Sequence, residues 1–295
     1  MTNLLLFVIT LLIWGSTWIA VEYQLGVVAV EVSLAYRYLL AAVLAFGWCA
    51  LRGESLRFGW LGHRYFILLG VLLFGLNYYS AYFAQIYLTS ALNAIVFSSL
   101  TWMNIVNARL FFNRKIEPRT YIGAGLGLLA IVVLFWPEVQ AVSLSDTVLT
   151  GAMFSLIGAS IASFGNMVSQ AAQLKKIPVM PANAWGMLYG GLLNTGIALM
   201  LGRTFNFDPS PGYVISFLFL TVFGSVIAFA CYLTLLGRIG LERSGYIVVM
   251  MPIVALALSA LFEGLVLEAH ILIGIALALA GNVVILGRQF ARERV

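Results

Sequence analysis

The stretch YFILLGVLLFGLNYYSAYFAQIYLTSALNAIVFSSLTWMNIVNA, residues 65–108, contains no Asp, Glu, Lys or Arg. Crossing the ~30 Å hydrocarbon core of a bilayer takes about 20 residues of helix. These 44 residues therefore predict two consecutive membrane-spanning helices. Other stretches free of these charges are 1–21, 120–137, 147–174, 177–202, 209–237, 244–262 and 269–287, and 32–51 holds one charge, Arg37. The sequence thus predicts ten spans.

The composition agrees with a chain that lies almost entirely in the bilayer. Of the 295 residues, 62% are hydrophobic and 9% are charged, against about 25% charged in an average soluble domain. The mean hydropathy is +1.02. Ten spans use about 200 residues, which leaves no room for an extramembrane domain. We expect an all-α integral membrane protein, and the composition excludes a soluble enzyme and a nucleic-acid-binding domain.

The basic residues give an orientation. With the N-terminus in the cytoplasm, 14 of the 16 Lys and Arg residues fall in inner loops or the inner tail. Arg203 alone falls in an outer loop, and Arg37 lies inside a span. Cytoplasmic loops of membrane proteins carry an excess of Lys and Arg. We therefore predict a multi-pass protein with both termini in the cytoplasm.

The two halves of the chain are weakly similar to each other. A shift of 150 residues places Trp14-Gly15 on Phe164-Gly165 and Tyr82 on Tyr232. We predict a first repeat over 1–140 and a second over 145–295, each with five helices. Because five is odd, the second repeat must be inverted in the membrane relative to the first. Inverted repeats are typical of secondary transporters.

Three motifs carry a family resemblance. They are WGSTWIAVE at 14–22, the run Arg37-Tyr-Leu-Leu-Ala-Ala, and MPIVALALSALFEG at 251–264. Together they resemble the drug/metabolite transporter superfamily, EamA type. The resemblance implies a bacterial inner-membrane exporter with two inverted five-helix repeats. It also implies a central cavity lined by helices 1–4 and 6–9, with helices 5 and 10 at the periphery.

Within the superfamily, the aromatic third and fourth helices look most like those of the aromatic amino-acid exporters. The chain departs from the family at two positions. Glu22 stands where a basic residue is common, and Trp102 stands where the second half has Pro252. Both changes alter what a pocket can recognise.

The third helix carries the best candidate for a binding surface. In GLNYYSAYFAQ, residues 75–85, Tyr78, Tyr82 and Gln85 share one helical face and Asn77 borders it. The alternative is an aromatic belt at the membrane interface. We favour a pocket wall made of rings and hydroxyls.

Other candidates for substrate binding lie on the first, fourth, sixth and ninth helices. They are Trp14, Trp18, Ser98, Trp102, Ser163, Asn166 and Tyr246. Helix packing is the alternative for each, since small and polar residues also join membrane helices. For Trp102 we expect either a hydrogen-bond acceptor for its indole N–H or a wet cavity.

Arg37 is the basic residue that lies clearly within a span. A charge inside the membrane is costly and is usually paired. Glu22 and Arg37 both fall toward the outer end of the first helical hairpin. We predict that they form an ion pair at the outer mouth, which either fixes the hairpin or contacts substrate.

The sequence offers no metal or cofactor site. The two histidines, His63 and His270, and the two cysteines, Cys49 and Cys231, are far apart. Without a carboxylate at mid-membrane we expect a uniporter or exchanger rather than a proton-driven pump. GAGLG at 123–127 contains the GxxxG motif of close helix packing. A monomer or a weak homodimer is therefore expected.

These patterns predict a secondary transporter, not an enzyme, that moves aromatic and other neutral amino acids by alternating access. That the transport is export is implied by the family resemblance. The expected partners are these solutes and the lipid bilayer. One alternative is export of other small metabolites or drugs. A channel is a further alternative, but the sequence contains no charged ring or filter loop.

Overall fold

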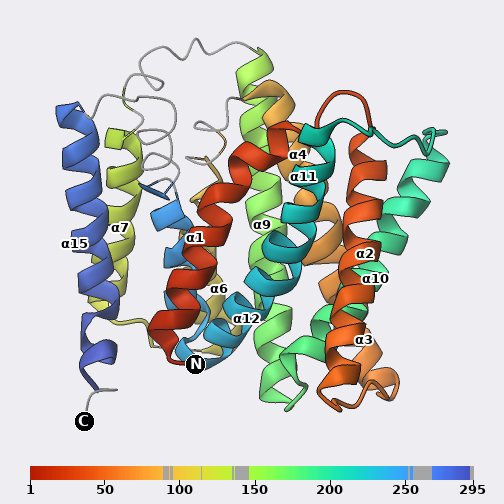
Figure 1. Cartoon of the computed structure of the whole chain (residues 1–295). Helices are drawn as coiled ribbons and strands as arrows, with labels where there is room; N and C mark the ends of the chain where they lie inside the picture. The colour runs from red at the N-terminus through yellow and green to blue at the C-terminus, as the bar shows by residue number, and fades with distance from the viewer. Residues whose placement is uncertain are drawn as a thin grey trace.

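A computed structural model describes residues 1–88, 93, 96–113, 115–134, 136, 146–251, 253–254 and 268–292, without the side chains of 18–19, 131, 134, 146, 282 and 285–292. The regular elements in this part of the chain are all helical (Figure 1). They are α1 (Asn3–Glu22), α2 (Val30–Leu51), α3 (Trp60–Val71), η1 (Leu72–Leu76), α4 (Asn77–Tyr87), α6 (Leu100–Phe112), α7 (Pro118–Leu134), α9 (Asp146–Leu174), α10 (Val179–Met200), α11 (Pro211–Phe219), η2 (Leu220–Ile227), α12 (Ala228–Ile239), α13 (Leu241–Ser244) and α15 (Ala269–Arg292).

Four of the described helices are long and apolar enough to cross a membrane. They span Val30–Leu51, Trp60–Tyr87, Thr147–Leu174 and Pro211–Ile239. Shorter apolar helices cover Asn3–Thr17 and Ala269–Gly281. Leucine, valine and isoleucine side chains are exposed along these helices, as on a surface that faces lipid. Of the span expected at 244–262, residues 252 and 255–262 lie outside the described residues.

The helix ends follow local sequence signals. The Thr2 side chain caps α1 by accepting a hydrogen bond from the backbone N–H of Leu5. At α11, Ser210 caps the first turn and Pro211 occupies the first helical position, where no intrahelical N–H bond is lost. Gly240 ends α12 with φ 93°, a left-handed conformation that glycine adopts without strain.

Two π-helical stretches interrupt long helices at matching places. When η1 is shifted by the 150-residue offset of the repeat, it falls inside η2. In each stretch a backbone carbonyl accepts a hydrogen bond from a distant helix. The Phe74 carbonyl accepts from Asn194 Nδ2 at 3.3 Å, and the Gly224 carbonyl accepts from Trp14 Nε1 at 3.0 Å. Such π-helical insertions are frequent at functional sites.

The packing of the two halves is also repetitive. The offset relates α1 to α9, α2 to α10, α4 to α12 and α7 to α15. The pair α1 and α12 is in contact, and so is the corresponding pair α9 and α4. In Figure 1, α1 rises from the end where the chain begins, whereas α9 descends toward that end. Helices α7 and α15 pack together at one edge of the bundle.

Glycines allow close helix contacts at two places. A Cβ on Gly190 would lie 2.6 Å from the Phe74 Cβ and 2.9 Å from the Gly70 carbonyl oxygen, so α10 packs directly on α3 and η1. A Cβ on Gly127 would lie 2.6 Å from Val249 Cγ1, and one on Gly281 would meet the Tyr246 hydroxyl. The GxxxG motif at 123–127 is therefore used at Gly127 inside the molecule, and it gives no support to a homodimer.

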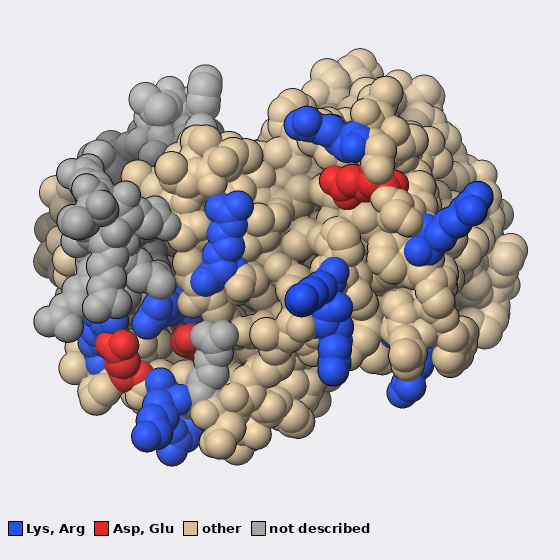
Figure 2. Space-filling view, turned by 90° about the horizontal axis from the view of Figure 1, so that it is seen from below, with Lys and Arg blue, Asp and Glu red and all other residues tan. Residues whose placement is uncertain are grey.

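The end of the bundle where α1 begins is the basic one. Figure 2 shows Lys and Arg spread over this face with few Asp or Glu. It carries the connections between α2 and α3 and between α9 and α10, where Arg52, Arg57, Lys175 and Lys176 are exposed.

Candidate functional site

A cavity of about 90 Å³ lies among helices of both halves. Its wall is formed by α1, η1, α4, α6, α9 and α12, by the helical residues 248 and 251, and by Phe97 just before α6. The lining extends from Trp14, Asn77 and Phe229 toward Val21 and Gln85. Val21 and Gln85 lie near the last residues of α1 and α4, at the end opposite the basic face.

Aromatic rings form one side of this central cavity. The Trp14 ring lies 5.0 Å from the Phe229 ring and 4.8 Å from the Tyr232 ring, centroid to centroid. The Tyr78 ring lies 6.2 Å from Phe229. The bond from the Trp14 indole to the Gly224 carbonyl fixes its orientation. Offset and edge-to-face rings of this kind can hold a flat apolar group.

Two asparagines supply polar atoms to the wall. Asn77 Nδ2 donates to the Leu73 carbonyl at 3.5 Å, and Asn166 Nδ2 donates to the Tyr232 hydroxyl at 3.0 Å. These bonds leave Oδ1 of both side chains buried and without a hydrogen-bond partner among the described residues. A buried amide oxygen without a partner costs free energy. Both oxygens can therefore accept hydrogen bonds from a bound molecule.

Arg37 lies directly behind the wall made by Tyr78 and Tyr82. Its side chain is buried, with 3% exposed. Nε donates to Ser225 Oγ at 2.9 Å and Nη1 donates to the Tyr82 hydroxyl at 3.3 Å. The guanidinium carbon also lies 4.8 Å from the centre of the Tyr78 ring, a cation–π contact. The charge is thus surrounded by hydroxyls and rings.

These contacts correct the expected ion pair with Glu22. In the part of the chain that the structure describes, Arg37 contacts Ser225, Tyr82 and tyrosine rings rather than a carboxylate. The reason is its place on α2, on the face that packs against η2 in the bundle interior. Glu22 ends α1 with an exposed side chain.

The structure brings five of the predicted substrate-binding residues onto the cavity wall: Trp14, Asn77, Tyr78, Tyr82 and Asn166. Trp18 lies in α1, and its side chain is outside the described residues.

The other four predicted residues lie away from the wall. Ser98 is buried in the turn before α6. Ser163 accepts a hydrogen bond from Asn107 at 2.7 Å, which joins α9 to α6. Tyr246 donates to the Ala278 carbonyl at 2.9 Å and packs at α7 and α15.

Trp102 faces away from the cavity as well. Its ring lies 6.2 Å from the Tyr121 ring of α7. Its indole N–H is buried without an acceptor among the described residues, so the expected acceptor is not found there. Sequence position alone could not separate the two faces of α6, since both carry polar and aromatic residues.

Sequence reasoning missed Tyr232 and Phe229 as members of the wall. The signal for Tyr232 was present, because the repeat places it on Tyr82 and both line the cavity. Phe229 lies in an apolar run with no feature that separates it from residues that face lipid. The described residues contain no group of three His, Cys, Asp or Glu that could hold a metal ion.

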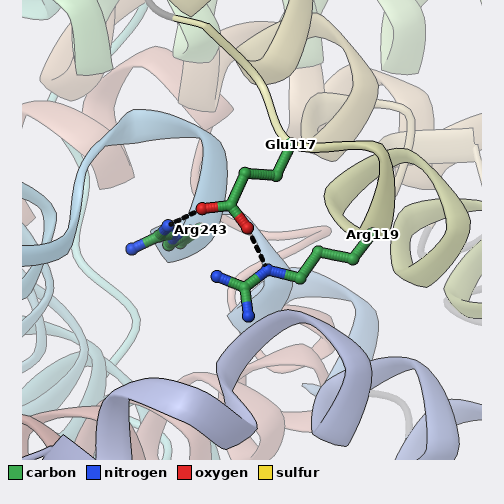
Figure 3. A network of polar contacts seen from close by, with 3 residues as sticks. All are labelled: Glu117, Arg119 and Arg243. Carbon is green, nitrogen blue, oxygen red and sulfur yellow. Dashed lines mark ion pairs between the residues drawn. The ribbon is translucent and has the colours of Figure 1, made fainter.

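The opposite end of the bundle is tied by charged residues. Glu117, just before α7, forms ion pairs with Arg119 and with Arg243 of α13, the latter at 3.6 Å (Figure 3). Arg238 donates to the Met1 carbonyl at 2.9 Å. These contacts connect the first half of the chain to the second at the basic end.

Comparisons with known proteins agree with this architecture. A model of the EamA-like transporter family matches residues 1–136 and 149–287. Protein PagO of Salmonella typhimurium is 22% identical over 269 residues, which cover 90% of this chain and 86% of PagO. One solved crystal structure of a protein superposes on this chain with a TM-score of 0.81 at 18% sequence identity. The match covers 99% of this chain and 98% of the solved chain.

The chain belongs to the EamA-like transporter family. It is a multi-pass membrane protein of a family of transporters, not enzymes, with two family halves. The matches do not distinguish the aromatic amino-acid exporters from other members. The solved structure supports the fold alone at this identity.

Proposed function

We propose that this protein is a secondary transporter that exports neutral amino acids, aromatic ones included, across a bacterial inner membrane. The observation that carries the proposal is the wall of the central cavity. Rings of Trp14, Phe229 and Tyr232 lie beside two buried amide oxygens without partners, Asn77 Oδ1 and Asn166 Oδ1. Rings suit an apolar side chain, and amide oxygens are acceptors for an ammonium group.

The transport cycle that we propose is alternating access by ten membrane helices in two inverted repeats, 1–140 and 145–295. The matching π-helical stretches and the opposite directions of corresponding helices support it. In such transporters one repeat rocks against the other around a fixed site. The ion pairs at the basic end and the cavity lining toward the other end fit a conformation open away from the basic face.

The proposed orientation places both termini in the cytoplasm. It rests on the excess of Lys and Arg at the end where α1 begins (Figure 2). The cavity then opens outward. Its volume of about 90 Å³ is smaller than an engineered cavity of about 150 Å³ that binds benzene. Small neutral amino acids therefore fit this conformation best, and phenylalanine requires the rings to move apart.

Counterflow in liposomes tests the proposal. Purified protein is reconstituted with a high internal concentration of unlabelled phenylalanine, threonine or methionine, and uptake of the same labelled amino acid is followed. A carrier is expected to accumulate label above the protein-free level, which a channel does not do. Trp14→Ala is expected to abolish accumulation, and Trp102→Ala, which removes a tryptophan outside the cavity, is its matched control.

Equal loss in both variants would argue against the cavity as the site. Folded protein without counterflow of any of the three would refute amino-acid transport. It would then favour other small metabolites or drugs, which the mainly apolar wall also admits.

A further inference from the structure

Arg37 has hydrogen-bond donors that the protein does not use. A guanidinium has five N–H donors, and Arg37 uses Nε toward Ser225 and Nη1 toward Tyr82. Nη2 has no acceptor among the described residues. A Cβ on Gly224 would lie 3.4 Å from Nη2 and 3.2 Å from Cγ2 of Thr17, so Nη2 lies near this residue of the cavity wall, although Arg37 itself does not line the cavity.

The charge of Arg37 has no compensating carboxylate in the described part of the chain. Its contacts are two hydroxyls and the rings of Tyr38 and Tyr78. A buried, uncompensated charge is strongly destabilising, and inside a membrane span it is a candidate functional site by default. Hydroxyls and rings lower this cost but leave the net charge in place.

We propose that Arg37 is the receptor for a carboxylate group of the transported solute, bound in the central cavity beside Thr17, Tyr78 and Tyr82. The inference rests on the proposed function in taking this cavity as the transport site. The carboxylate completes the donor set of the guanidinium and neutralises its charge. Substrates are therefore organic carboxylates, and amines or amides of the same shape bind more weakly.

With Arg37 on one side and the two asparagines on the other, the cavity can bind both charged groups of a zwitterion. The Arg37 guanidinium binds the carboxylate, whereas Asn77 Oδ1 and Asn166 Oδ1 accept from the ammonium group. The Trp14 ring is held by the Gly224 carbonyl, next to the residue that bonds Arg37 Nε, Ser225. The η2 stretch thus positions both the aromatic wall and the charge.

Two ligands that differ in charge and little in shape test the proposal. They are 3-phenylpropionate and its neutral counterpart 3-phenylpropanamide, and their binding to the purified full-length protein in detergent is measured by calorimetry. The wild-type protein is expected to bind the carboxylate at least about 10-fold more tightly. Truncating one partner of a buried charge pair costs at least about 2 kcal/mol, so Arg37→Gln is expected to weaken carboxylate binding about 30-fold or more. Its affinity for the amide is expected to change less than about 3-fold.

Two further variants keep the test decisive if Arg37→Gln does not fold. Arg37→Lys retains the charge without the planar donor fork and is expected to keep the preference for the carboxylate at lower affinity. Thr195→Ala in α10, whose hydroxyl bonds the Gly191 carbonyl of its own helix, is the control and is expected to match the wild type.

Equal wild-type affinity for the two ligands, or no binding of the carboxylate, would overturn the inference. So would an Arg37→Gln protein that keeps the preference. Absent amino-acid counterflow combined with an intact carboxylate preference would refute the proposed function and leave this inference standing, with other organic acids as substrates.

Discussion

Tyr82 in α4 and Tyr232 in α12 occupy matching positions of the two halves and line the same cavity. Their hydroxyls nevertheless bond to different groups. Tyr82 accepts from the charged Arg37 at 3.3 Å, whereas Tyr232 accepts from the neutral amide of Asn166 at 3.0 Å. The repeat therefore preserves the framework but not the chemistry. Behind the cavity wall, the tyrosine of the first half is thus bonded to a cation, whereas the tyrosine of the second half is bonded to a neutral amide.

The second half has no charge at the position that corresponds to Arg37. Aligning the first residues of α2 and α10 places Arg37 on Gly186. Gly186 instead lets the Phe74 ring approach α10, at 2.9 Å from the position of a Cβ. One half holds a hydrogen-bonded charge at this position and the other uses it for close packing.

The largest effect is expected from Tyr82→Phe. The change removes the acceptor of an N–H from a buried charge, and such hydrogen bonds contribute about 1.5–3 kcal/mol. We expect a fall of that size in the free energy of unfolding, measured by denaturation in detergent. We also expect weaker binding of 3-phenylpropionate. An unchanged free energy of unfolding would show that the bond of Tyr82 to the charged Arg37 is not stronger than the bond of Tyr232 to the neutral Asn166.

The next effect is expected from Gly190→Ala. The new methyl would lie 2.6 Å from Phe74 Cβ, and overpacking of this kind costs about 1–3 kcal/mol. When the first residues of α2 and α10 are aligned, Gly190 corresponds to Ala41 of α2. The first half therefore already holds a methyl group at this position.

Thermal unfolding checks this prediction, with Gly196→Ala as the control. Gly196 lies on the same helix with nothing within 4 Å of a Cβ. A control that is destabilised as much as Gly190→Ala would show that the loss arises from α10 in general and not from its contact with η1.

Tyr232→Phe is expected to have a smaller effect than Tyr82→Phe. It removes a hydrogen bond between neutral groups, which contributes about 0.5–1.5 kcal/mol. Denaturation of both variants under the same conditions gives the comparison directly. A larger loss for Tyr232→Phe would reverse the assignment of the charged and neutral sides.

The smallest effect is expected from Glu117→Gln at the basic end. The carboxylate is half-exposed and pairs with Arg119 and Arg243 (Figure 3). Exposed ion pairs contribute about 0–1 kcal/mol. The free energy of unfolding of the variant is therefore expected to fall by no more than about 1 kcal/mol. A large loss of stability would mean that this tie between the halves matters more than the contacts around the cavity.

The sequence predicted the membrane class from physical patterns that need no tertiary information, and the family from the resemblance of short motifs. Apolar runs without charge identify spans because every backbone group in lipid must bond within its own helix. The face with Tyr78 and Tyr82 followed from helical spacing, and the structure places both on the cavity wall. The repeat placed Tyr232 on Tyr82, but this signal was not used, and Tyr232 was missed as a residue of the wall.

The remaining site residues could not be assigned from spacing. Trp14 and Trp102 are both tryptophans in membrane helices, yet one lines the cavity and the other faces α7. In a membrane both lipid and protein interior accept apolar side chains, so composition does not distinguish them.

The sequence by itself determined that this chain is a helical membrane protein with two related halves, because hydropathy and internal similarity can be compared segment by segment without a structure. The tertiary structure decided where the charge of Arg37 goes. Glu22 is close in sequence, but Ser225 lies 188 residues away and is brought beside Arg37 by the packing of η2 on α2. A hydrogen bond depends on distances between atoms, and only the packed helices fix those distances.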